Sequence, residues 1–213
     1  NFVFQSALFM ENKNYQEDLQ HIRKMMEKSS RFISLSGISG VFAGLFALAG
    51  AIYVYFFFKK NGVDYFEGTV KYYEKDFIVH LVIVAMVIMV LAISSGAYFT
   101  IKKSKAHHLQ IWDATTKKLL YNFAIPLGIG GLFCAGLLYH GLHGLLSPAT
   151  LIFYGLALFN AGNYTFSDIK YLGLCEMALG IVSLFFLGYG LFFWAVGFGV
   201  LHIVYGIVMH KKY

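Results

Sequence analysis

The chain of 213 residues is strongly apolar and sparsely charged: 58% of its residues are hydrophobic, 13% are charged, and its mean hydropathy is +0.64. A water-soluble domain has about 25% charged residues, so this composition excludes an ordinary soluble globule. The net charge of +6 does not indicate a nucleic-acid partner, because Lys and Arg are clustered at the ends of apolar runs and form no basic stripe. The partner we expect is a lipid bilayer.

The N-terminal part of the chain divides into two segments. Residues 1–9 contain the run NFVFQS, which is similar to a tobacco-etch-type protease site, so we interpret them as the remnant of an expression tag. In residues 10–31 the apolar side chains recur at steps of three and four, which predicts an amphipathic helix on the cytosolic side. Two placements of this helix remain open: in the membrane interface or paired with another helix.

The rest of the chain consists of long apolar runs separated by short polar segments. A helix needs about 20 apolar residues to cross a hydrocarbon core, and the runs predict an all-α, integral membrane six-helix bundle. Ser147 before Pro148 predicts a helix start that the serine caps, and Tyr189, between two glycines, predicts a tight turn. The predicted spans are about 32–58, 77–101, 119–139, 147–161, 169–187 and 191–209.

The charges of the loops predict the orientation. Residues 102–118 contain five lysines and one aspartate, whereas residues 140–146 contain no Lys or Arg. Because basic loops stay on the cytosolic side, we expect a multi-pass protein of a cell membrane, the bacterial inner membrane, with both termini in the cytosol.

Glycine-rich runs that begin at Gly40, Gly131 and Gly180 fall in the odd-numbered spans. They predict three copies of a helical hairpin, with chance as the alternative because Gly and Leu are common in membrane helices. The segment Gly173–Tyr213, with its run GFGVLHIVYG, resembles small uncharacterised bacterial membrane proteins, distantly those of the acid-resistance membrane family. This resemblance implies repeated hairpins and no site residues.

The first candidate site is formed by Glu176 and His202, because an ionisable group inside a span is costly unless it has a partner. Each stands 13 residues from Tyr189, about 20 Å from the turn at 1.5 Å per residue, so we predict that the two touch and share one proton. A cytosol-facing binding pocket is expected there, and its further candidates are Asn160, Ser36 and Ser95. The alternative is an interhelical contact that only locks two helices together.

The second candidate site is a set of histidines at the outer face, His80, His140 and His143. Imidazoles at this spacing are able to share a metal ion, although interfacial histidines are more often solvated. No phosphate-binding loop, zinc-protease motif or nucleophile elbow is present in the sequence. We therefore predict no cofactor and no catalytic residue.

Three functions compete at this stage. The favoured hypothesis is an interaction or regulatory membrane protein that contacts a protein partner through residues 10–31. The alternative is a small-molecule or proton-coupled transporter or channel that uses the pocket at Glu176 and His202. A membrane-embedded metalloenzyme is the least favoured, and a homo-oligomer is left open.

Overall fold

A computed structural model describes residues 36–62, 74–106 and 111–213 of the chain. The predicted tag remnant and the predicted amphipathic helix lie outside the described residues. The described part is helical throughout, without a strand.

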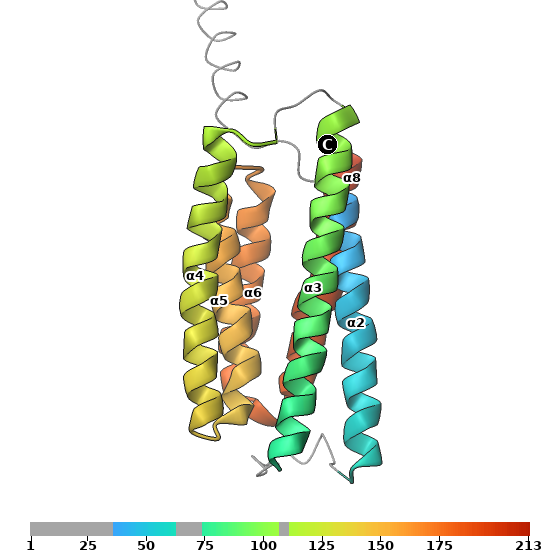
Figure 1. Ribbon diagram of the computed structural model, residues 1–213, viewed down its shortest axis with the longest axis vertical. Coiled ribbons are helices and arrows are strands. Elements are labelled where there is room, and N and C mark those ends of the chain that lie inside the picture. Colours follow the sequence, from blue (N-terminus) through green and yellow to red (C-terminus); the bar gives the residue numbers. More distant parts are fainter. Residues whose placement is uncertain (1–35, 63–73, 107–110) are drawn as a thin grey trace, which may run out of the picture.

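Six helical columns make up the described chain (Figure 1). The sixth column is continuous and contains the short helix α7, the π-helix η3 and the helix α8; short 3₁₀ turns, η1 and η2, precede α5 and α7. The bounds are α2 Gly37–Lys60, α3 Lys75–Ala106, α4 Ala114–Tyr139, η1 His143–Leu145, α5 Leu146–Ala161, α6 Asp168–Leu184, η2 Leu187–Tyr189, α7 Gly190–Trp194, η3 Ala195–Leu201 and α8 His202–Lys212. These columns match the six predicted runs.

Five of the columns are long and apolar enough to cross a membrane. The sixth, α6, has 17 residues, the lower end of the range of about 17–25 residues for a crossing helix. α6 therefore falls just short of the five longer apolar segments, and it is the helix that contains Glu176.

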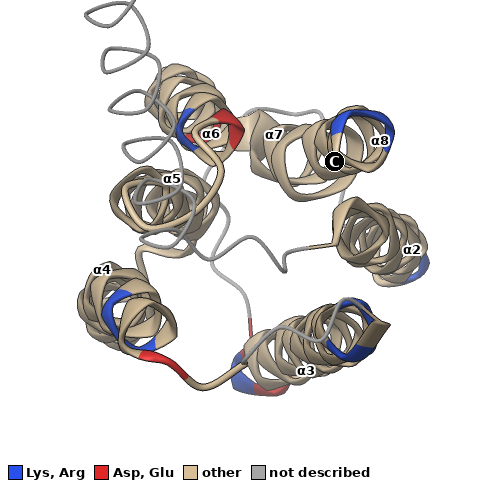
Figure 2. Cartoon of the chain, turned by 90° about the horizontal axis from the view of Figure 1, so that it is seen from above, with Lys and Arg blue, Asp and Glu red and all other residues tan. Residues whose placement is uncertain are grey.

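The columns are packed as two halves, which are seen side by side from above (Figure 2). In the α2 half, the central helix α2 packs against α3 on one side and against η3 and α8 on the other. In the α5 half, the central helix α5 packs against α4 and α6. Of the three predicted hairpins, α2–α3 and α4–α5 are extensively packed pairs. The arms of the third, α6 and α8, pack mainly on α5 and α2 and only slightly on each other.

Glycines let the helices within each half approach closely. A Cβ atom on Gly155 of α5 would lie 2.6 Å from the carbonyl oxygen of Gly173 on α6, and a Cβ on Gly173 would lie 2.6 Å from that of Gly155. Between α2 and α8, a Cβ on Gly206 would lie 2.6 Å from the carbonyl oxygen of Gly37. Small residues at helix interfaces permit such backbone contact in membrane proteins, so each half is tightly closed.

Two helix starts show how local chemistry fixes the helix boundaries. Asp113 caps α4: its Oδ1 accepts hydrogen bonds of 2.7 Å from the N–H and from the hydroxyl of Thr116. These bonds lower the pKa of the Asp113 carboxyl. The predicted cap at Ser147 is wrong, because α5 begins one residue earlier and Ser147 instead donates its hydroxyl to the carbonyl oxygen of Gly190 at 2.6 Å.

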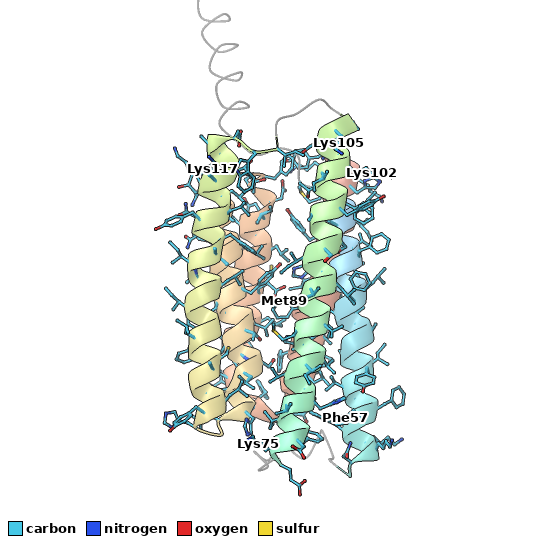
Figure 3. All side chains as sticks on the ribbon, viewed as in Figure 1. Phe57, Lys75, Met89, Lys102, Lys105 and Lys117 are labelled. Atoms are coloured by element: carbon cyan, nitrogen blue, oxygen red, sulfur yellow. The ribbon has the colours of Figure 1, made fainter. Side chains whose placement is uncertain are left out.

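The two ends of the bundle differ in charge. Lys102, Lys105 and Lys117 lie at the end where α8 finishes, and Lys75 lies at the opposite end together with Phe57 (Figure 3). At the lysine-rich end Lys212 donates to Asp168 at 2.8 Å, which joins the end of α8 to the start of α6. This hydrogen bond lowers the pKa of the Asp168 carboxyl.

Candidate functional site

Glu176 and His202 meet at the boundary between the two halves. Glu176 is fully buried and His202 is 6% exposed, and Oε1 of the carboxylate lies 3.3 Å from Nδ1 of the imidazole. The contact predicted from their equal distance to Tyr189 is confirmed. Asp168 and Lys212 join the same two columns eight residues before Glu176 and ten after His202, so two polar contacts link α6 with α8 at different depths.

The hydrogen bonds of His202 define its tautomer. Nδ1 lies 3.0 Å from the carbonyl oxygen of Gly197, and because a carbonyl only accepts, Nδ1 bears a hydrogen. Nε2 lies 2.8 Å from the hydroxyl of Tyr154 on α5. In the neutral imidazole Nε2 accepts the hydrogen of Tyr154, whereas in the imidazolium it donates to the phenolic oxygen.

That the two groups share one proton stays a prediction. The hydrogen of Nδ1 is directed to the carbonyl oxygen of Gly197. Oε1 of Glu176 therefore faces the imidazole at 3.3 Å without a hydrogen bond between them.

The carboxylate itself is poorly supplied with donors. Among the described residues, neither oxygen of Glu176 has a hydrogen-bond partner, and the same holds for the buried hydroxyl of Ser183, seven residues further along the same face of α6. An ionised carboxylate without hydrogen bonds costs several kcal/mol in a nonpolar interior. Unsatisfied buried groups in a native fold are rare and call for a functional explanation or a water molecule.

The π-helix shapes the place where Glu176 fits. Gly197 lies within η3, and a Cβ atom on it would lie 2.5 Å from Oε2 of Glu176. The missing side chain at Gly197 therefore makes room for the carboxylate. In a π-helix the backbone is locally widened, and such single turns are frequent at functional sites. Neither Gly197 nor Tyr154 was predicted as a site residue. The role of Gly197 depends on the contact of its carbonyl oxygen with His202, five residues later, and the role of Tyr154 depends on a third helix, α5.

The other predicted members of this pocket are not assembled around Glu176. Ser36 precedes the first residue of α2 and Asn160 is the penultimate residue of α5, so both lie at helix ends, whereas Glu176 is in the middle of α6. The Ser95 hydroxyl donates to the carbonyl oxygen of Ala92 in its own helix at 2.9 Å. The prediction that these side chains lie at the depth of Glu176 is wrong for Ser36 and Asn160.

A cavity of about 450 Å³ lies on the same boundary, toward the end opposite the lysines. It is lined from both halves, by α2 and α3 on one side and by α4, η1 and α5 on the other, with α7 between them. None of the five predicted pocket residues lines it. Trp194 does line it, and this ring packs on Phe198 at 5.0 Å, which in turn packs on Tyr154 at 4.9 Å and on His202 at 6.0 Å. A chain of aromatic contacts thus joins the cavity to the Glu176–His202 pair.

The three histidines predicted to bind metal have other surroundings. His80 Nε2 bonds the hydroxyl of Tyr53 at 2.9 Å, and its ring stacks on Phe57. His140 packs edge-on against Tyr139, and His143 lines the cavity. Within the described ranges, no three His, Cys, Asp or Glu side chains form a group that could hold a metal ion.

No protein-family model, curated protein or solved structure matches this chain.

Proposed function

We propose that the chain is an integral membrane protein that acts as a proton-coupled transporter, with the coupling proton held by Glu176 and His202. The proposal depends on one observation: a fully buried carboxylate lies 3.3 Å from an imidazole, between two separately packed halves of the bundle.

Membrane insertion is supported by the surface of the bundle. α3 contains the most apolar window of the five long helices, and no residue of that window is buried in the protein. Large apolar side chains are exposed elsewhere as well, among them Leu132 on α4 at 78% and Phe185, which directly follows α6, at 79%. Monomeric soluble proteins rarely expose contiguous apolar patches of more than a few hundred Å², so hydrocarbon is the solvent that fits these helices. The lysine-rich end then faces the cytosol.

A transport role is supported by the arrangement of the halves. Each half is closed by glycine contacts, whereas the boundary between them holds the polar pair and the cavity. Transporters place substrate and coupling-ion sites at the interface of two helical units that rock against each other. Rocking of the α2 half against the α5 half would change the contact of His202 with Glu176 and with Tyr154, since these three side chains come from different halves.

The test measures proton binding without requiring the substrate. In proteoliposomes adsorbed to a solid-supported membrane, a rapid pH step should produce a transient charge displacement. We expect Glu176→Gln, which keeps the size of the side chain, to abolish this signal. Asp168→Asn is the matched control, because Asp168 is at the helix end and bonded to Lys212, and it should retain the signal.

Two results would contradict the proposal. A pH-step signal that is unchanged in Glu176→Gln would exclude Glu176 as the proton site. If the signal is absent from the unaltered protein and Glu176→Gln only lowers the unfolding temperature, the pair is a structural contact between helices. The interaction role expected of residues 10–31 concerns residues outside the described ranges and stays a prediction.

A further inference from the structure

The cavity at the boundary is lined almost entirely by hydrocarbon. No Asp, Glu, Lys or Arg is among its lining residues. The two hydroxyl groups in it are already used as donors within the protein: Ser147 donates to the carbonyl oxygen of Gly190 at 2.6 Å, and Thr150 donates to that of Ser147 at 2.9 Å. No described side chain in the lining is an acid, and His143 is the one base among them, at the outer end in η1. Along the rest of the cavity an apolar ligand finds matching walls.

The cavity extends along α3. On this helix its lining runs from Ile78 to Ile88, ten residues or about 15 Å at 1.5 Å per residue. A cavity of about 450 Å³ that follows a helix over this length suits an extended hydrocarbon chain.

One wall of the cavity is incomplete. α3 packs on α2, and α4 packs on α5, but α3 and α4 form no extensive interface with each other. They stand apart both from the side and from above (Figures 1 and 2), and the cavity is lined by residues of both helices, such as Ala85 and Cys134. In a bilayer this side faces the acyl chains of the surrounding lipid.

We propose that the cavity binds one acyl chain of a bilayer lipid, which enters between α3 and α4 and completes the packing between the two halves. The chain lies along α3 and passes Trp194, with its inner end near Gly50 and Ile88 and its head group at the level of η1, where the helices end. This inference rests on the membrane insertion proposed above and does not depend on the proton-binding role of Glu176.

The protein contains a reporter for this site, because its two tryptophans are Trp112 and Trp194. Trp112→Phe removes the exposed ring that precedes α4 and leaves Trp194, which lines the cavity, as the single fluorophore. This variant is reconstituted in phosphatidylcholine bilayers with brominated acyl chains, and insertion is verified by flotation. We expect bromine to quench the fluorescence of Trp194.

A matched pair of variants separates the cavity from the bulk lipid. In the Trp112→Phe background, Ala85→Phe places a ring in the cavity, whereas Ala97→Phe adds the same ring on the same helix outside the lining. We expect Ala85→Phe to reduce the quenching of Trp194 by about twofold or more, because a close-packed ring leaves no room for the chain. Ala97→Phe should leave it unchanged. Val54→Phe fills the cavity from α2 and serves if Ala85→Phe does not fold.

Equal quenching in the Ala85→Phe and Ala97→Phe proteins would overturn the proposal, since Trp194 would then sense only bulk lipid. Quenching by a brominated fatty alcohol in an unbrominated bilayer, but not by brominated phosphatidylcholine, would also overturn it, because the occupant would be a free single-chain molecule. If the quenching difference persists while the pH-step signal fails, only the transport proposal is contradicted.

Discussion

Gly197→Ala is the most specific test of the site, because it adds a single carbon atom, the Cβ, next to Glu176. The new Cβ would lie 2.5 Å from Oε2 of Glu176 and 2.5 Å from Cδ2 of Leu151. Ordinary Cβ contacts begin at 3.4 Å, so each neighbour has to move by 3.4 − 2.5 = 0.9 Å. Both neighbours are fully buried, and neither is able to move into open space.

The expected magnitude follows from two opposing effects. Overpacking a closed interior costs about 1–3 kcal/mol, whereas replacing glycine by alanine within a helix stabilises by about 0.5–1 kcal/mol. The difference is about 0–2.5 kcal/mol, and because both neighbours are fully buried we expect Gly197→Ala to lower the free energy of unfolding by an amount in the upper half of that range. Gly131→Ala is the control, since a Cβ on Gly131 in α4 would have no atom within 4 Å. It should stabilise the protein by about 0.5–1 kcal/mol.

The free energies are measured by equilibrium unfolding in mixed micelles, and the pH-step signal is recorded on the same proteins. A double-mutant cycle with Glu176→Ala isolates the carboxylate: once it is removed, Gly197→Ala should cost less by about 0.5–1 kcal/mol or more. The same sign of effect at Gly197 and Gly131 would refute the close packing at η3. If the double-mutant cycle shows no coupling energy, the new methyl group collides with Leu151 and not with Glu176.

Three further outcomes are expected. Asp113→Ala should destabilise α4 by about 1 kcal/mol at neutral pH. The hydrogen bonds from Thr116 lower the pKa of Asp113. The stabilisation of α4 by this cap is therefore complete above the ordinary carboxyl pKa and disappears as the pH falls through the lowered value. Asp113→Asn should keep the cap and remove this pH dependence, as measured by thermal unfolding across pH. Tyr154→Phe should cost about 1 kcal/mol in mixed-micelle unfolding by removing the hydroxyl that bonds His202. Gly173→Ala, followed by the same unfolding measurement, should cost about 1–3 kcal/mol because its methyl group meets the backbone of α5.

The sequence predicted the features that depend on local pattern. Apolar runs of sufficient length predicted the six helical columns, because helix length follows directly from hydropathy. The Glu176–His202 contact was predicted from two facts: an ionisable group inside a span needs a partner, and the two residues are equally far from Tyr189. A constant rise per residue converts that equal spacing into equal depth. Gly173 and Gly180, at steps of three and four residues from Glu176 on the same helix, are buried with it.

The features that the sequence did not predict depend on which helices pack together. The order of the columns around the bundle does not follow from hydropathy, so α8 was expected on α6, whereas it packs mainly on α2. The role of Tyr154 required knowledge that α5 lies beside His202. Ser36 and Asn160 were placed too deep because the ends of the apolar runs do not fix where a helix begins or ends within the bundle.

The π-helix explains how these packing choices and the site fit together. Gly199 and Gly206 of the sixth column face α2, where a Cβ on Gly206 would lie 2.6 Å from Gly37. On the same column, Gly197 and His202 face Glu176 of the other half. In a regular helix, two residues that are five apart in sequence point in directions about 140° apart, at 3.6 residues per turn. The turn of η3 is wider, and in it His202 Nδ1 lies 3.0 Å from the carbonyl oxygen of Gly197. The widened turn thus lets one helix pack by glycine on α2 and hold an imidazole toward α6.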